Sequence, residues 1–362
     1  MRWLRLLPLV VVVVLSVLWA LPPSGLDFAV YWRGGHDVLV GLSPYRELDS
    51  LPFTYPAFSA VLFVPFALLP EHIAYVVWQV LIIAALIVAT LIVAERSGLD
   101  AKVATWLLAG SMLLQPVVRD IQLGQINTVI VLLVVVDLFV LPKRYRGLLI
   151  GVAAGIKLTP AVFAVLFLFR REWASALRAV AAGLGTILLP ALVIPADTLL
   201  YWTKLIFDPS RIGGADYGDN QSLVGVIARA MNGSKPPTLV TLPVEIIVLA
   251  LACWLAWQFH VRRDEVGAML AVALGSLLVS PVSWSHHWVW VVPALAWLVA
   301  RRSWVWAGLL AAVTLVTHLF LPDNPRLAPL VAELCYDLLP AVGLALLVAG
   351  LITTRAPRSV AA

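Results

Sequence analysis

The chain has 362 residues, of which 62% are hydrophobic and 12% are charged, and its mean hydropathy is +0.97. A water-soluble domain of this length would expose large apolar patches, so the composition excludes a soluble enzyme and predicts an all-α protein with several membrane spans. The net charge of +5 does not indicate nucleic acid, because Arg and Lys gather in short segments beside apolar runs.

The first expected element is a membrane span over residues 6–21, which follows Arg2 and Arg5. These basic residues predict a cytoplasmic N-terminus and place segment 22–56 outside the membrane. No small-residue cleavage site of a signal peptide is clear, so we expect the span to be retained. The aromatic residues after Asp27 predict helices that lie in the membrane interface within this first outer loop.

Further apolar segments follow the first. They lie at about 57–69, 73–94, 103–114, 127–141, 147–169, 174–194, 239–260, 266–281, 288–300, 304–321 and 335–353. The sequence therefore predicts about 12 transmembrane segments in all. Several are shorter than the ~20 residues that a full span needs.

Basic clusters predict which connections are cytoplasmic. They leave segments 115–126, 195–238, 282–287 and 322–334 outside. Successive connections should alternate between the two sides of the membrane, but this alternation fails twice. It fails between the first outer loop and Arg96, and again between Arg146 and Arg170. Broken or re-entrant helices would resolve both failures, because Pro70 and Pro160 are helix breakers at suitable places.

Asp27 is the first candidate for chemistry, since it lies in the outer loop just past the first span. A carboxylate there is close to lipid headgroups and available for acid or base chemistry. Alternatively, Asp27 only caps the short helix that follows it, because Asp is a favoured N-cap residue.

Two polar interruptions of apolar segments come next. Gln125 and Asn127 open a span with amides that lipid cannot satisfy, so they face protein or a water-filled cavity, or simply make a cap or an interhelical hydrogen bond. Lys157 lies beside a helix breaker within segment 147–169. It is a candidate phosphate contact, or it extends to the cytoplasmic interface.

Two outer segments carry further polar residues. In loop 195–238, Arg211, Asn220 and Gln221 would suit a phosphate and sugar hydroxyls, although any exposed loop has a similar composition. In turn 282–287 and its flanks, His286 and His287 stand between tryptophans that include Trp284. The tryptophans also fit an interfacial aromatic belt with incidental histidines. We expect no metal site, because no Cys or His partner stands at ligand spacing.

In their order along the chain, these motifs resemble a known family. The chain is similar to the actinobacterial polytopic GT-C glycosyltransferases that use polyprenyl-phosphate sugars, especially the α-(1→2)-mannosyltransferases of phosphatidylinositol mannoside and lipomannan synthesis. The resemblance runs from Asp27 to about Leu298. It rests on segments 27–31, 51–56, 124–127, 155–160, 220–222 and 278–290. The family often has Pro-Pro where this chain has Pro56 and Ala57, and the C-terminal part matches nothing known to us.

The resemblance implies a single GT-C transmembrane domain over residues 1–362 with its active site on the extracytoplasmic face of the cell membrane. It implies that Asp27 is the general base and that His286 or His287 binds the donor phosphate, with Arg211 and Lys157 as further candidates. Lys157 can take part only if its segment is re-entrant. The other substrate-binding residues implied are Tyr31, Tyr55, Gln125, Asn127, Asn220, Gln221 and Trp284.

We therefore expect an inverting transferase that moves mannose from polyprenyl-phosphate-mannose to a lipid-linked mannoside, with no metal or other cofactor. Two alternatives remain. One is a polyprenyl-phosphate-arabinose-dependent arabinofuranosyltransferase, which the motifs do not separate from a mannosyltransferase. The other is a transporter or flippase of lipid-linked sugars, because an intramembrane Lys and broken helices also occur in transport proteins. The expected partners are membrane lipids, the lipid-linked donor and a glycolipid acceptor, with the oligomeric state left open.

Overall fold

The computed structural model describes residues 7–21, 25–47, 51–233, 236–316 and 336–355, and every element in these ranges is a helix. The α-helices are α1 (Leu7–Trp19), α2 (Leu26–Leu39), α3 (Ala57–Ala67), α4 (Glu71–Arg96), α5 (Ala101–Ser111), α6 (Gln115–Leu123), α7 (Asn127–Phe139), α8 (Leu148–Ile156), α9 (Val165–Phe169), α10 (Trp173–Val193), α11 (Pro195–Thr203), α12 (Leu223–Ala230), α13 (Thr238–Val261), α14 (Glu265–Val279), α15 (Val291–Ala300), α16 (Trp304–Val316) and α18 (Leu338–Arg355). The 3-10 helices are η2 (Thr159–Ala164), η3 (Leu205–Phe207), η4 (Pro209–Ile212) and η5 (Ser285–Trp290).

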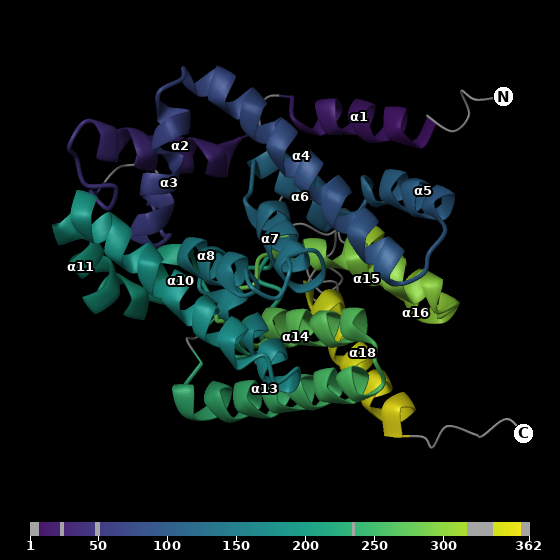
Figure 1. Cartoon of the computed structure of the whole chain (residues 1–362). Coiled ribbons are helices and arrows are strands. Elements are labelled where there is room, and N and C mark those ends of the chain that lie inside the picture. The colour runs from purple at the N-terminus through teal and green to yellow at the C-terminus, as the bar shows by residue number, and fades with distance from the viewer. Residues whose placement is uncertain (1–6, 22–24, 48–50, 234–235, 317–335, 356–362) are drawn as a thin grey trace, which may run out of the picture.

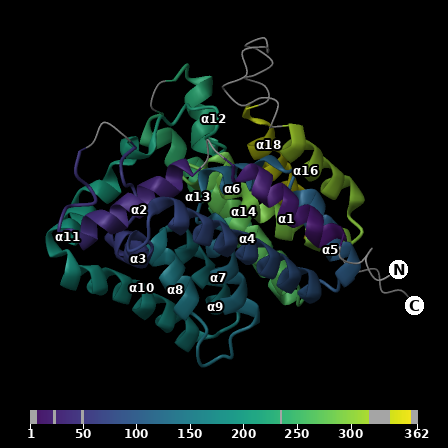
Figure 2. The same ribbon diagram turned by 90° about the horizontal axis from the view of Figure 1, so that it is seen from above.

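The helices form one bundle in which α7 is central. In both views α2, α3 and α11 lie on one side and α5 and α16 lie on the other (Figures 1 and 2). The long helix α4 runs between these two sides and contacts α7 and α15 (Figure 1). This arrangement lets residues near the start of α2 meet residues of α6 and of the turn between α6 and α7.

Three helices in the described ranges, α4, α10 and α13, are long and apolar enough to cross a membrane. Helices α5 and α6 pass the same test as a pair that is bent by 66°. Large apolar side chains on the outside of α10 and α13, such as Leu188 and Ile246, are exposed. Together with the composition, these helices show a membrane protein, because a soluble fold would bury such a surface.

The apolar segments expected from the sequence correspond to helices, with one break and one difference. Segment 147–169 breaks where α8 ends and Lys157 is extended (φ −148°, ψ 130°), before η2 begins. Segment 115–126 was expected to be an outer loop, but most of it is α6. The predicted outer segment 322–334 lies outside the described residues.

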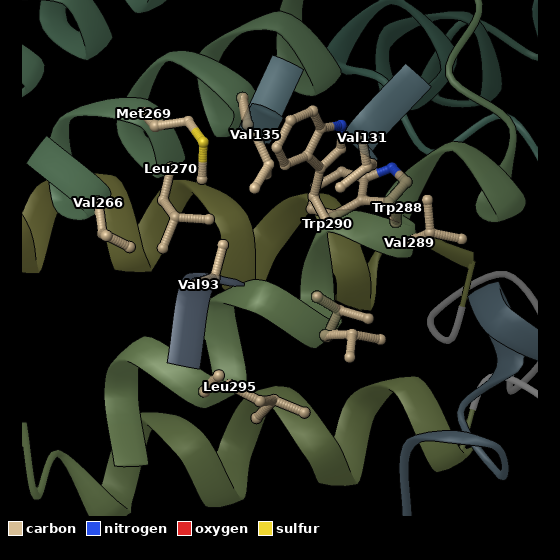
Figure 3. Close-up of a cluster of buried hydrophobic side chains, with 14 of the residues drawn as sticks. Val93, Val131, Val135, Val266, Met269, Leu270, Trp288, Val289, Trp290 and Leu295 are labelled. Atoms are coloured by element: carbon tan, nitrogen blue, oxygen red, sulfur yellow. The ribbon is translucent and has the colours of Figure 1, made fainter. Parts of the chain in front are cut away.

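The main core lies among α4, α7, α14, η5 and α15. Figure 3 shows its centre, where Trp288 and Trp290 of η5 accompany Val131 and Val135 of α7 and Leu270 of α14. Apolar side chains converge here from segments far apart in the chain. This packing fixes η5, and with it the two histidines that η5 carries.

A second, aromatic cluster holds α2 against α3 and α4. The ring centroids of Tyr31 and Phe63 are 4.9 Å apart, and those of Phe63 and Trp78 are also 4.9 Å apart. Gly35 allows the close approach of α2 to α3, because a Cβ atom there would lie 2.5 Å from the carbonyl carbon of Phe63. The first turn of α2, which carries Asp27, is thereby fixed relative to α4.

Candidate active site

Side-chain hydrogen bonds join four segments that are distant in the sequence. They are the start of α2, the turn between α6 and α7, the extended residue after α8, and η5. Each segment lies at the end of a helix or between two helices, where the backbone is not fully paired within a helix. Four of the six sequence motifs that carry the family resemblance therefore meet in one place.

Gln125 connects Asp27 to two tyrosines. Its Nε2 atom donates a hydrogen bond to Oδ2 of Asp27, and its Oε1 atom accepts one from the Tyr31 hydroxyl at 2.8 Å. The Tyr55 hydroxyl lies 3.3 Å from the same Oε1 atom and 2.8 Å from the Tyr31 hydroxyl. The two tyrosines thus orient the amide so that its NH₂ group faces the carboxylate.

The capping role considered for Asp27 is wrong. The N-cap of α2 is Gly25 in the left-handed conformation (φ 87°), and no side chain caps the helix. The Gly25 amide donates to the carbonyl of Gln122 at 2.6 Å, which ties the start of α2 to α6. Gly124 ends α6 with φ 67°, and its carbonyl accepts from the Trp78 indole at 2.7 Å. These contacts place Asp27 beside Gln125.

Lys157 lies at the centre of a second group of contacts. Its Nζ atom is 3.2 Å from Oδ1 of Asn127 and 2.7 Å from Nε2 of His287. Asn127 in turn donates to Oδ1 of Asp120 at 2.9 Å. The ammonium therefore contacts side chains of the cluster, so the alternative that Lys157 extends to the cytoplasmic interface is wrong.

Several buried polar atoms in this region have no hydrogen-bond partner within the described part of the chain. They are Nε of Arg119, Oδ2 of Asp120, Oδ1 of Asp219, Oε1 of Gln221 and both ring nitrogens of His286. Buried polar groups are normally paired, and each unpaired one is costly. Their concentration around one cluster indicates that it binds a polar ligand.

Arg119 is a candidate site residue that the sequence reasoning missed. Its charge lowers the pKa of both Asp27 and Asp219, so it lies near both carboxylates. No ion pair of Arg119 occurs among the described residues, whereas Arg146, Arg170 and Arg301 each pair with a carboxylate. A guanidinium without a carboxylate partner is available to bind a phosphate.

The carboxyl groups of Asp27 and Asp219 have raised pKa values. Burial raises the pKa of Asp27 above the ordinary Asp value of 3.8. The hydrogen bond from Gln125 and the charges of Arg119 and Lys157 lower this pKa, but by less than burial raises it. Burial also raises the pKa of Asp219, to about 6, although its Ser285 hydrogen bond and the charge of Arg119 lower it. Raised values bring a carboxylate closer to the range in which a general base works efficiently.

Segment 219–222 is held against the segment that precedes η5. The amide of Gln221 donates to the Ser283 carbonyl at 2.7 Å, and the Ser285 amide donates to the Asp219 carbonyl at 3.0 Å. Oδ1 of Asn220 accepts from the Ser283 amide at 2.9 Å, and its Nδ2 atom donates to the carbonyls of Ala215 and Pro281. Asn220, expected to bind substrate, has its side chain occupied by this backbone contact.

Two other predicted site residues lie at the edge of this region. The Trp284 ring packs edge-on against Tyr217, with ring centroids 5.8 Å apart. The Arg211 guanidinium donates to the Phe53 carbonyl at 3.1 Å and lies over the Tyr45 ring. Among the described residues, Arg211 makes no hydrogen bond or ion pair with Asp27, Lys157 or the histidines, so the structure does not bring Arg211 into the cluster.

The cluster thus combines carboxylates at Asp27, Asp120 and Asp219 with cations at Arg119 and Lys157. No group of three or more His, Cys, Asp and Glu residues that could hold a metal ion occurs in the described ranges. A half-buried carboxylate beside two cations can accept a proton from one reactant while the cations bind the anionic group of another.

Comparison with known proteins gives a consistent result. Residues 53–281 match glycosyltransferase family 87. The chain is 38% identical over 316 residues to a polyprenol-phosphate-mannose-dependent alpha-(1-2)-phosphatidylinositol pentamannoside mannosyltransferase of Mycolicibacterium smegmatis, which covers 82% of this chain and 76% of that protein. It is 36% identical over 338 residues to a polyprenol-phosphate-mannose-dependent alpha-(1-2)-phosphatidylinositol mannoside mannosyltransferase of the same organism, covering 83% and 76% of the two chains. No solved structure matches the chain.

Proposed function

Because the chain belongs to glycosyltransferase family 87, we propose that it transfers mannose from polyprenyl-phosphate-mannose to a phosphatidylinositol mannoside, forming an α-(1→2) linkage. The names of two relatives that each cover most of this chain support the donor, the acceptor and the linkage. The structural observation that carries the proposal is the contact of Asp27 with Gln125 in a cluster that also holds Arg119 and Lys157.

In this proposal Asp27 is the general base. The acceptor hydroxyl oxygen forms a bond to the anomeric carbon of mannose as the bond from that carbon to the phosphate oxygen breaks. The hydroxyl proton passes to the Asp27 carboxylate, and the bonding electron pair leaves with the phosphate. The hydroxyl becomes acidic only as the new bond forms, so a positioned carboxylate accelerates transfer by about 10²- to 10⁴-fold.

The leaving group is a lipid phosphate whose negative charge increases in the transition state. Arg119 and Lys157 supply positive charge in the same cluster, and His287 bonds the Lys157 ammonium. Charged donors that are already in place stabilise such a developing charge without reorganisation. In this scheme Asp27 acts as the base and no carboxylate attacks the sugar. Transfer is therefore a single displacement, which inverts a β-linked donor to an α product. No metal or cofactor takes part in this scheme.

We further propose a single GT-C domain of about 12 transmembrane segments, a cytoplasmic N-terminus and an extracytoplasmic site. The distance between Trp78 and Arg96 along α4 supports the placement of the site and of the arginine-rich end of the bundle on opposite sides of the membrane. Trp78 bonds the turn beside Gln125, and Arg96 ends the same helix. These residues are separated by about 27 Å at 1.5 Å per residue, close to the ~30 Å hydrocarbon thickness of a bilayer.

The proposal is tested by transfer of radiolabelled sugar to a phosphatidylinositol mannoside in detergent, with polyprenyl-phosphate-mannose and polyprenyl-phosphate-arabinose compared as donors. We expect mannose transfer by the wild type and its loss in Asp27→Asn, with donor binding retained. Glu47→Gln, which removes an exposed carboxylate of the same outer loop, is the matched control. Transfer of arabinose alone would refute the donor assignment. Full mannose transfer by Asp27→Asn would place the base elsewhere, with Asp219 the next candidate.

A further inference from the structure

A second polar cavity lies at the opposite end of the bundle from the catalytic cluster. Its volume is about 560 Å³. Arginines at the ends of several helices line it, namely Arg96, Arg146, Arg170, Arg262, Arg263 and Arg301. Three carboxylates, Glu172, Asp264 and Glu265, line it as well. The lining therefore carries more positive than negative charge.

The three carboxylates are already paired. Glu172 pairs with Arg146 at 2.9 Å, Glu265 pairs with Arg170 at 2.7 Å, and Asp264 pairs with Arg301. They therefore neutralise half of the six arginines that line the cavity.

The other three arginines keep their charge. Arg96 donates to the Phe139 carbonyl, and Arg262 donates to oxygens of Gln258 and Thr354. Arg263 is exposed, and its side chain makes no hydrogen bond or ion pair within the described ranges. These contacts are to uncharged groups, so they satisfy donors without neutralising the arginines. The six arginines and three carboxylates give the cavity a net charge of +3, which favours the binding of an anion.

An apolar groove adjoins this cavity. Its volume is about 390 Å³, and both hollows are lined by Trp297 and Arg301. Leucines of α14 and α18, including Leu270, Leu274 and Leu346, line the groove. An arginine-rich cavity beside an apolar groove, with Trp297 and Arg301 lining both, matches a molecule with an anionic head and a hydrocarbon chain.

We propose that this end of the protein binds an anionic phospholipid, with its phosphate in the arginine-lined cavity and an acyl chain in the adjoining groove. Basic pockets between transmembrane helices bind anionic headgroups in this manner. The apolar groove favours a phospholipid over free phosphate, because a free anion would leave the groove without an occupant. The site is separate from the catalytic cluster, from which it is about 27 Å distant along α4.

The test measures binding of phosphatidylglycerol and phosphatidylcholine to the full chain in mild detergent, by native mass spectrometry and by the shift in Tm. We expect phosphatidylglycerol to bind and to raise the Tm, because a ligand specific to the folded state stabilises it. Arg96→Gln combined with Arg262→Gln and Arg263→Gln should weaken binding on the order of a hundredfold. The control combines Lys143→Gln, Arg144→Gln and Arg302→Gln, which remove the same charge outside the cavity lining.

Two further arms separate the possible outcomes. Arg263→Glu alone keeps the test valid if the triple variant does not fold, since no contact of Arg263 is lost. Ala294→Phe narrows the groove and should weaken phospholipid binding while leaving binding of glycerol phosphate unchanged. Equal binding of phosphatidylglycerol by the wild type and both cavity variants would overturn the proposal. So would a Tm shift that glycerol phosphate reproduces in full, because it would indicate a site for a free phosphate.

Discussion

Replacement of Arg119 by Gln tests the one part of the reaction scheme that was inferred from the structure and not from the sequence, namely that Arg119 binds the leaving phosphate. The guanidinium has no ion-pair partner in the described ranges, so its removal leaves no carboxylate partner stranded in the fold. The variant should therefore fold normally. Its charge nevertheless acts on Asp27 and Asp219. We expect two separate kinetic effects from this single change.

The first effect is on the rate of transfer at high pH. Removing one preorganised donor to a developing negative charge lowers kcat by about 10²- to 10³-fold, or ~2.7 to 4 kcal/mol. The second effect is on the acid limb of the pH profile. Arg119 lowers the pKa of Asp27, so without it the pKa of Asp27 rises further. Because the base must be ionised, activity in Arg119→Gln should disappear at a higher pH than in the wild type.

The assay is initial-rate transfer of mannose at saturating acceptor across a range of pH. Arg211→Gln provides the comparison, because its guanidinium bonds the Phe53 carbonyl and lies outside the cluster. We expect Arg211→Gln to keep the acid limb of the wild type. If Arg119→Gln retains both the wild-type kcat and the wild-type acid limb, then Arg119 does not contact the leaving phosphate and the scheme is wrong. Equal losses of kcat in Arg119→Gln and Arg211→Gln would indicate that positive charge in general, and not Arg119 in particular, supports the transfer.

Three other results are expected. Asp219→Asn should move the acid limb to lower pH in the same assay, because the Asp27 and Asp219 charges repel each other and the pKa of Asp219 is about 6; an unchanged limb would contradict this coupling. Lys157→Met should lower mannose transfer by about 10²-fold with the Tm measured in parallel, and a rate within twofold of wild type would exclude a phosphate role. Gly35→Leu should destabilise the fold by about 1 to 3 kcal/mol in thermal unfolding, because α3 leaves no room for a side chain. Gly110→Ala, where nothing lies within 4 Å, is the control, and equal Tm values for the two variants would show that α2 can move away.

Much of the fold follows from the hydrophobic pattern. The apolar segments are helices, and the break at Lys157 occurs beside the predicted helix breakers. The number of spans does not follow as directly, because only α4, α10 and α13 pass a length test alone in the described ranges. Short helices that pack in a bundle have the same composition as spans, so hydropathy cannot distinguish them.

The candidate site was predictable where a polar residue interrupts an apolar run. Gln125, Asn127 and Lys157 all stand out in this way, and hydrogen bonds connect them to predicted neighbours. Arg119 does not stand out, because its segment alternates polar and apolar residues and so contains no long apolar run for a charge to interrupt. The signal that was available is the spacing of Gln115, Arg119 and Gln122, which places the three on one face of a helix.

Other features depended on tertiary contacts that no local pattern contains. Asn220 was expected to contact substrate, but its side chain bonds the backbone of a segment more than sixty residues away. Asp219, the residue before it, instead has an unpaired buried oxygen. Neighbouring residues in one loop thus have opposite roles, which composition cannot resolve.

In the proposed reaction, the hydrogen bond from Gln125 also determines which oxygen of Asp27 receives the proton. Both tyrosine hydroxyls can donate to Oε1 of Gln125, so its NH₂ group is directed at Oδ2 of the aspartate. A proton on Oδ2 would face this donor, whereas a proton on Oδ1 would not. The acceptor hydroxyl must therefore approach from the Oδ1 side, and this requirement selects one orientation of the acceptor sugar relative to α2.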